Sequence, residues 1–247
     1  MSNPYETDEL VNQYLAFHYG PTYFEVPNYA LHCADICLGL MQGRSMRRAL
    51  DLGCAVGRST FELARGFEAV VGIDLSSRFV EAARALQEGD VLPYFLHDEG
   101  VLGHTAKASL SDLGLIDMAR KVHFEQGDAC QLKADLGQFD LVFAGNLIDR
   151  VANPAAFLDT LQHVVNPGGL LVISSPYTLL DEYTPRENWL GGVVVDGQSR
   201  TMLQGMTQAL APAFVPLGSP QDVPFVIRET ARKYQHSIAQ LTVWARV

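Results

Sequence analysis

One stretch of the sequence, Ala49 to Thr60, constrains the fold of this chain more than any other. A short apolar run leads into a turn that holds Gly53 and Gly57, and the residues after the turn have helical spacing. A strand, a glycine-bearing turn and a helix in this order begin a βαβ unit, whose ligands bind where the strand ends. The two glycines would leave room for a ligand, and Asp51 adds a carboxylate beside the turn. Tight turns of this kind also serve packing alone, so both interpretations stay open.

The rest of the chain alternates between strand-like and helix-like segments. Apolar runs predict strands at 48–52, 69–73, 122–125, 139–144 and 170–174. Helical periodicity predicts helices at 60–65, 78–87, 154–165 and 201–210. Strands that alternate with helices pair in parallel, so these five strands form the centre of one sheet. Alternating residues at 225–229 and 240–245 predict antiparallel edge strands, and we expect a mixed seven-stranded sheet in a Rossmann-like α/β fold.

We expect a single domain with three parts. The first part is a helical cap at residues 1–45, and the second is the ligand-binding core at residues 46–175. The third is a substrate-side segment with the edge strands at residues 176–247. Glycine, proline and aspartate break the periodicity between 89 and 111, which predicts an insertion. Pro167-Gly168-Gly169 predicts a turn before the last central strand.

Composition excludes several classes of partner. The chain has 247 residues, of which 48% are hydrophobic, and this is enough for one sizeable core. A formal net charge of -10 without any Lys/Arg-rich run would repel a phosphate backbone, so nucleic acid is excluded as a substrate. No apolar run approaches the roughly 20 residues of a membrane span, and Met1 to Glu9 lacks a signal-peptide pattern. We therefore expect a cytoplasmic protein with no membrane partner.

The cysteines predict neither a disulfide framework nor a metal site. Four of them, Cys33, Cys37, Cys54 and Cys130, are scattered through apolar sequence and are expected to be reduced. His32 lies beside Cys33 and Cys37, but no second pair of ligands accompanies them, so we expect no metal.

Polar residues follow the next predicted strands at the same edge of the sheet. Asp74 closes the second strand, where a carboxylate can accept hydrogen bonds from both hydroxyls of an adenosine ribose. Asp128 follows the third strand and can receive an adenine amino group, with Ala129 against the ring. Capping a helix is a second role for Asp128 that is compatible with the first. The fourth strand ends at Asn146, where ligands of open α/β sheets bind.

Taken in order, these motifs resemble those of the class I methyltransferases that depend on S-adenosylmethionine (SAM). The resemblance covers roughly residues 45–175 and implies an enzyme whose cofactor is SAM. One position departs from the pattern, because Ala55 stands where family members often have glycine, which narrows the turn. The resemblance implies that the cofactor is bound by Asp51, Gly53, Cys54, Ala55, Gly57, Asp74, Leu75, Asp128, Ala129 and Asn146.

A nicotinamide dehydrogenase would also place an acidic residue at the end of its second strand. Its turn usually has the denser Gly-x-Gly-x-x-Gly spacing, which binds a pyrophosphate. This sequence lacks the third glycine, and a carboxylate at Asp51 is poorly suited to a phosphate. Both features favour SAM, which has no phosphate.

A narrower resemblance concerns the acceptor. Asn3 to Gly20 and Tyr23 to Asn28 resemble the methyltransferase part of ovothiol-biosynthesis proteins, as does Ser175-Pro176-Tyr177. The chain thus resembles a stand-alone 4-mercaptohistidine (5-thiohistidine) N1-methyltransferase, which implies a small thiohistidine-like substrate methylated on an imidazole nitrogen. Aromatic rings can cover a sulfonium and stack on a heteroaromatic ring, although each ring can equally serve core packing. The expected substrate contacts are Tyr5, Tyr14, His18, Tyr19, Tyr177 and Tyr183.

The expected mechanism depends on positioning, because the methyl group of SAM is already activated. His18 is the candidate to take the departing proton or to orient the substrate, although a helix residue satisfied by a neighbour is the alternative. Asn146 is the candidate to hydrogen-bond the imidazole, and Arg150 or Arg186 can bind a substrate carboxylate. Two other functions stay open, namely a methyltransferase for another small acceptor and a non-catalytic SAM-binding protein.

Overall fold

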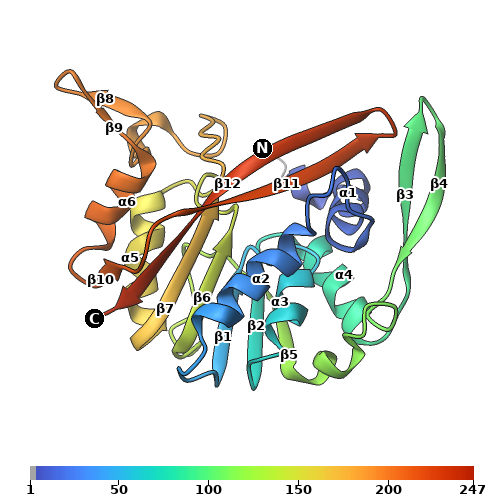
Figure 1. The fold of residues 1–247 in the computed structure, drawn as a ribbon, viewed down its shortest axis with the longest axis horizontal. Helices are drawn as coiled ribbons and strands as arrows, with labels where there is room; N and C mark the ends of the chain where they lie inside the picture. Colours follow the sequence, from blue (N-terminus) through green and yellow to red (C-terminus); the bar gives the residue numbers. More distant parts are fainter. Residues whose placement is uncertain (1–3) are drawn as a thin grey trace.

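The computed structural model describes residues 4–247, so Asn3, the first residue of the acceptor-related motif, lies outside the described part. Its main sheet has the order β10-β12-β7-β6-β1-β2-β5, with β11 paired to β12 (Figure 1). The central parallel strands are β1 (Arg48–Leu52), β2 (Ala69–Asp74), β5 (Val122–Gln126), β6 (Phe139–Gly145) and β7 (Val165–Ser175). The antiparallel strands are β10 (Phe214–Pro216), β11 (Gln221–Thr230) and β12 (Lys233–Arg246). The predicted mixed α/β fold is confirmed.

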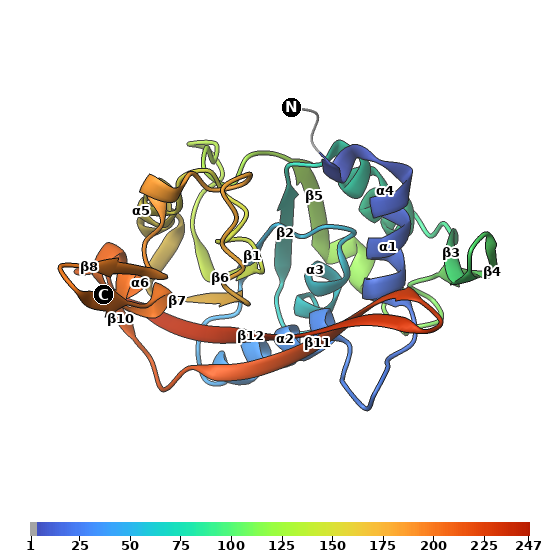
Figure 2. The same cartoon turned by 90° about the horizontal axis from the view of Figure 1, so that it is seen from above.

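Helices cover both faces of the sheet. The first face carries α2 (Tyr29–Leu40), α3 (Arg58–Leu63) and α4 (Ser77–Gln87), and the second carries α5 (Pro154–Val164) and α6 (Met202–Leu210) (Figures 1 and 2). Strand β1 divides its side chains between them, since Ala49 packs in the first core and Leu50 in the second. Side-chain caps begin most of these helices, as where Ser76 accepts a hydrogen bond from Phe79 at α4.

The N-terminal cap lies against the first face, beside α4. It consists of the short helix η1 (Pro4–Glu6) and of α1 (Asp8–Tyr19), which begins at the cap residue Thr7. Glu6 holds the cap to the start of α4, because its carboxylate accepts hydrogen bonds from the amide and the hydroxyl of Ser77 at 2.7 and 3.0 Å. This attachment brings the aromatic residues of α1 toward the carboxyl ends of the parallel strands.

Three segments differ from the sequence prediction. Residues 89–111, predicted only as an insertion, contain a hairpin of β3 (Leu92–Glu99) and β4 (Leu102–Ala108). Pro167-Gly168-Gly169 lies within β7 instead of preceding it, and the pairing of β7 with β6 shifts register there. The seventh strand of the main path is β10, while β11 and β12 form a long hairpin that reaches the cap (Figure 2).

The remaining elements are the small hairpin of β8 (Val193–Val195) and β9 (Gln198–Arg200) and the short helices η2 (Ile116–Lys121) and η3 (Arg186–Asn188). Within residues 4–247, no helix is both long and apolar enough to cross a membrane. The same residues hold no group of three or more His, Cys, Asp or Glu side chains placed for a metal ion. All four cysteines are free, and Cys33, Cys37 and Cys54 are buried.

Candidate functional site

Backbone strain marks the carboxyl edge of the sheet. Ala55, Asn146 and Tyr177 follow β1, β6 and β7, and each has a positive φ, at 47°, 51° and 53°. Non-glycine residues adopt this region rarely and at a cost, and such residues gather at functional sites. Three of the six strained non-glycine residues in the described part of the chain therefore lie along one edge.

The turn after β1 wraps over the end of β2. The amides of Gly53 and Cys54 donate to the carbonyl oxygen of Ile73 at 2.8 and 3.1 Å, and the amide of Ala55 donates to the carboxylate of Asp74 at 2.9 Å. Gly53 has a φ of 72°, which favours glycine. Hydrogen bonds to the end of β2 thus hold the turn, in which Gly53 is half-buried while Cys54 and Ala55 are buried.

At Gly57, an expected cofactor contact, the lack of a side chain also serves the packing of the core. A Cβ atom at Gly57 would lie 2.7 Å from the buried ring of Phe124 and 3.0 Å from Cβ of Ala83. Its φ of 85° adds a second reason for glycine. At Gly53, by contrast, a Cβ atom would meet the side chain of Leu147 at 3.2 Å.

Asp51 is buried under the turn and not bonded to its amides. Its Oδ2 accepts hydrogen bonds from the hydroxyls of Ser59 and Thr60 at 2.6 and 2.7 Å, while its Oδ1 has no hydrogen-bond partner among the described residues. Burial raises the pKa of Asp51 to about 6, although the two hydroxyls oppose the shift. Asp51 therefore fixes the start of α3, and only Oδ1 remains for a ligand or a water molecule.

Asp74 lies at the centre of the candidate cofactor site. Its two oxygens accept from the amides of Ser76 and Ala55, both at 2.9 Å, and each oxygen keeps a further lone pair. Burial raises the pKa of Asp74 to about 6, and the two amides oppose this shift. The next side chain, Leu75, is 58% exposed. An apolar surface beside a carboxylate is the pattern that a nucleoside needs.

Asp128 follows β5 beside this position. Gly127 donates its amide to the carbonyl oxygen of Asp74 at 2.9 Å, which brings Asp128 and the buried Ala129 next to the end of β2. Oδ1 of Asp128 accepts from the amide of Cys130 at 2.8 Å, so Asp128 stabilises a turn. No helix follows in this segment, so the helix-capping role considered from the sequence is not observed.

The structure brings the aromatic residues of the cap and of the tail together above Asp74. The rings of Tyr5 and Tyr14 lie 6.1 Å apart, edge to face, and the guanidinium of Arg150 lies 4.8 Å from the ring centroid of Tyr183. Burial, together with Tyr14 and Tyr183, raises the pKa of Tyr5. Burial and the nearby charge of Asp74 raise the pKa of Tyr14 to about 12. These residues, far apart in sequence, therefore share one site.

A second polar group lies at the ends of β6 and β7. The hydroxyl of Tyr29 donates to Oδ1 of Asn146 at 2.8 Å and lies 2.7 Å from the hydroxyl of Ser174. The hydroxyl of Tyr177 donates to the side chain of Gln240 at 3.1 Å. Sequence reasoning missed Tyr29 and Ser174, because neither belongs to a recognisable motif.

His18 and Tyr19, two of the expected substrate contacts, are both buried near the end of α1. His18 is buried, and burial, followed by the charge of Arg58, lowers its pKa to about 3. A neutral imidazole of this kind is a poor proton acceptor near pH 7, although its Nδ1 has no hydrogen-bond partner in the described part of the chain. The hydroxyl of Tyr19 donates to the carbonyl oxygen of Val56 at 2.8 Å, so this tyrosine supports the turn.

The two candidate arginines differ in exposure and in the side chains that they contact. Arg186 is exposed, pairs with Asp181 at 3.4 Å and covers the ring of Trp189. The side chain of Arg150 is only 26% exposed and lies beside the tyrosine cluster. Only Arg150 is therefore placed to meet a ligand at the carboxyl edge.

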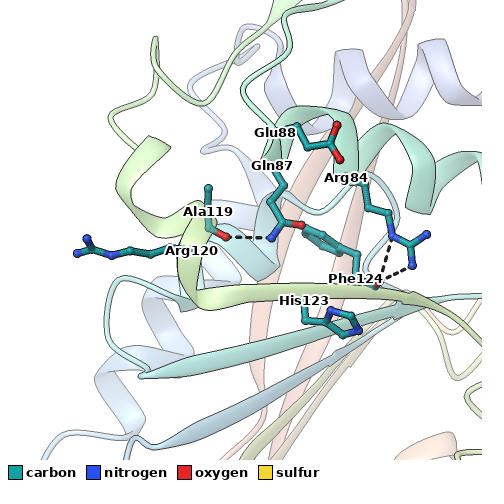
Figure 3. A pocket seen from close by; sticks show the side chains of 7 residues that line it. All are labelled: Arg84, Gln87, Glu88, Ala119, Arg120, His123 and Phe124. Atoms are coloured by element: carbon teal, nitrogen blue, oxygen red, sulfur yellow. Dashed lines mark hydrogen bonds between the residues drawn. The ribbon is translucent and has the colours of Figure 1, made fainter.

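A surface hollow of about 510 Å³ lies away from this edge, between the end of α4 and the start of β5. Its polar groups serve the fold (Figure 3): Arg84 donates to the carbonyl oxygen of Phe124, and Gln87 to that of Ala119, while Arg120 points away. The hollow lies at the amino end of the parallel strands, where ligands of open α/β sheets do not bind. We assign it no role.

Comparison with known proteins places the chain among methyltransferases. The sequence profile of the family described as "Methyltransferase domain" matches residues 50–173. The O-methyltransferase cnsE of Penicillium expansum is 30% identical over 126 residues, which are 51% of this chain and 36% of that protein. A ubiquinone biosynthesis O-methyltransferase of Psychrobacter cryohalolentis is 29% identical over 133 residues, which are 54% and 42% of the two chains. The matched region thus spans less than half the length of these relatives.

Solved structures agree on the fold. The magnesium protoporphyrin IX methyltransferase of Synechocystis, solved with bound S-adenosylhomocysteine (SAH), has a TM-score of 0.59 and 16% identity, covering 98% of this chain and 97% of that one. The N-methyltransferase NodS of Bradyrhizobium japonicum, also with bound SAH, has a TM-score of 0.54 and 15% identity, covering 96% and 98%. Both likenesses extend over nearly the whole chain, including the cap and the tail.

Proposed function

Because this chain belongs to the methyltransferase domain family, we propose that it transfers a methyl group from SAM to an imidazole nitrogen of 5-thiohistidine, forming ovothiol. One observation carries the proposal: the glycine turn, the aromatic cap and Arg150 meet at a single edge of the sheet. The family supports the donor and the reaction type. The acceptor rests on the sequence resemblance of the cap and on the side chains described above.

The residues at the end of β2 fit SAM. The free lone pairs of Asp74 can accept from the two ribose hydroxyls, while Leu75 and Ala129 offer apolar surface to the adenine on either side. Tyr14, whose ring lies near Asp74, extends this surface toward the positive sulfur. The strained turn at Ala55 brings the backbone close to the donor without a long side chain.

The donor supplies an activated methyl group, so the side chains of this protein mainly position the acceptor. The hydroxyl of Tyr29 holds Oδ1 of Asn146, which leaves the amide nitrogen of Asn146 to donate to the acceptor's sulfur. A thiol-substituted imidazole has a neutral form with a nitrogen lone pair near pH 7, so it needs no strong base. His18 then packs within the cap and takes no proton, since its pKa of about 3 keeps it neutral.

A turnover assay with several acceptors tests the proposal. The purified protein is incubated with SAM and with 5-thiohistidine, histidine or a catechol, and the product is identified by mass spectrometry and NMR. We expect methylation of the thiohistidine ring nitrogen. Methylation of the catechol and of no imidazole would replace this function with that of an O-methyltransferase, the activity named for the curated relatives above.

Calorimetry with SAM and with NAD separates the remaining alternatives. Binding of SAM without transfer to any acceptor would identify a non-catalytic SAM-binding protein. Binding of NAD in place of SAM would contradict the assignment of the donor.

A further inference from the structure

A buried carboxylate next to Arg150 is not used by the steps described so far. Asp149 lies in the turn after β6 and is 0% exposed. Its Oδ2 receives a hydrogen bond from Nη1 of Arg150 at 2.9 Å, whereas its Oδ1 has no hydrogen-bond partner among the described residues. An unsatisfied buried carboxylate oxygen is costly, so it requires an explanation.

Asp149 lies on the acceptor side of the site. Burial raises the pKa of Asp149, while the charge of Arg150 and, after it, the hydroxyl of Ser175 and the amide of Thr178 oppose the shift. Burial and, after it, the charge of Asp149 raise the pKa of Tyr177. Burial also raises the pKa of Tyr29, whose hydroxyl holds Asn146, and Asp149 adds a smaller contribution after Cys33. The carboxylate therefore lies between the ends of β6 and β7, close to where the acceptor must lie.

The segment after β7 covers Asp149. The carbonyl oxygen of Thr178 accepts from Arg150 at 3.0 Å, and the hydroxyl of Thr184 donates to the carbonyl oxygen of Val151 at 2.7 Å. A ligand would have to displace this segment to reach Oδ1 and Arg150 together. The hydrogen bonds that the ligand then forms offset the cost of moving the segment.

The charges of Asp149 and Arg150 cancel, so the pair favours a ligand that is itself neutral overall but carries both charges. A free α-amino acid has this character, with an ammonium and a carboxylate on one carbon. The guanidinium of Arg150 has donors besides the Nη1 that bonds Asp149, and these suit a carboxylate. The open oxygen of Asp149 suits the ammonium. A neutral phenol would leave this oxygen unsatisfied.

We propose that Oδ1 of Asp149 binds the α-ammonium group of the acceptor and makes the enzyme selective for free amino acids over their deaminated analogues. The inference rests on the proposed function, because it places the acceptor's amino-acid end between β6 and β7. It assigns Asp149 to substrate selection and not to the chemical step.

Binding measurements test this role without turnover. The protein saturated with SAH is titrated with histidine and with imidazole propionate, which lacks the amino group. We expect histidine to bind the wild-type protein about 10- to 100-fold more tightly, the range of a charged hydrogen bond. Asp149→Asn removes the charge at nearly constant shape, and we expect it to bind the two ligands about equally. Asp181→Asn, an exposed acid that pairs with Arg186, is the matched control and keeps the preference.

The outcomes separate this inference from the proposed function. A wild-type protein that shows no preference for histidine, or a D149N variant that keeps it, overturns the role of Asp149, even where thiohistidine is methylated. Loss of the preference in D149N supports the role, even where thiohistidine is not methylated and the proposed acceptor fails. Because the wild-type titration alone can overturn the inference, the test does not depend on the folding of D149N.

Discussion

Asp74 on the cofactor side and Asp149 on the acceptor side are buried carboxylates that are held in opposite ways. At the end of β2, both oxygens of Asp74 accept hydrogen bonds from backbone amides. At the end of β6, one oxygen of Asp149 accepts from Arg150, and the other has no hydrogen-bond partner within residues 4–247. A carboxylate that the backbone holds in place suits a cofactor that is the same in every turnover. A carboxylate with one oxygen lacking a hydrogen bond suits a substrate that supplies a donor.

This difference explains why one side is easier to predict. Backbone geometry follows from glycine spacing and strand order, both of which are visible in the sequence. The acceptor side is assembled from side chains of the cap, of the turn after β6 and of the tail, for which no spacing rule exists. Variants that change only cofactor binding or only acceptor binding therefore test this difference.

The largest effect is expected from Gly57→Ala, which tests whether the turn is built for packing. The added Cβ would lie 2.7 Å from the ring of Phe124 at a φ of 85°. Left-handed strain and overpacking together should lower the free energy of unfolding by about 2–5 kcal/mol, measured by urea denaturation. Gly53→Ala is the control and should cost less, because it meets only the side chain of Leu147. Equal losses would contradict the distinction.

Arg150→Met should act on the acceptor side alone. Loss of a charged hydrogen bond to the acceptor's carboxylate should weaken acceptor binding by about 1.5–3 kcal/mol, which is seen as a rise in KM. SAM affinity should stay unchanged. Arg186→Met is the matched control, because this exposed arginine pairs only with Asp181, and it should change neither quantity. A larger effect at Arg186 would move the acceptor to another part of the tail.

Asp74→Ala should act on the cofactor side alone. Loss of the ribose acceptor should weaken SAM binding by roughly 1–3 kcal/mol in calorimetry, since the ribose hydroxyls would lose their partner. The affinity for histidine in the presence of saturating SAH should not change. An unchanged SAM affinity would refute the ribose role.

The pH dependence of SAM binding sharpens the same assignment. Burial raises the pKa of Asp74 to about 6, and only the ionised carboxylate accepts from both ribose hydroxyls. SAM affinity should therefore be constant above pH 7 and fall by up to about tenfold for each pH unit below 6. Asp51 has a similarly raised pKa of about 6, so Asp51→Asn is the control. If the fall disappears in D51N and persists in Asp74→Asn, the titrating group is Asp51.

The smallest effect is expected from Ala55→Gly. Glycine relieves the left-handed strain at a φ of 47° but loses more entropy on folding, so the free energy of unfolding should rise by less than about 1 kcal/mol. SAM affinity should stay within twofold, as roughly 0.4 kcal/mol corresponds to a factor of two. A large loss of affinity would show that the methyl group of Ala55 contacts the donor.

Prediction from the sequence succeeded where local pattern decides structure. Strand β1 was predicted with its observed bounds, and the other strands of the parallel core were located by their apolar runs. The order of these strands predicts that Asp74, Asp128 and Asn146 lie at one edge of the sheet, where the structure has them. Their role in binding the cofactor stays a prediction.

The failures have a physical reason in each case. The β3–β4 hairpin is hard to recognise because β3 buries only Tyr94 and Leu96, and most of β4 is exposed. The environment of His18 depends on burial by the cap, and burial cannot be read from one residue type. Tyr29 and Asp149 meet Asn146 and Arg150 through tertiary packing, which the sequence alone does not specify.

The long β11–β12 hairpin ties the two ends of the described chain to each other. The last part of β12 pairs with β7, while Phe225 of β11 packs against Phe17 and Tyr29, and Arg228 pairs with Asp98 of β3 at 2.6 Å. The hairpin thus connects the sheet to the cap. Substitutions along the hairpin can then change the acceptor preference while the turn after β1 and Asp74 stay the same, so that one fold can evolve to use new substrates.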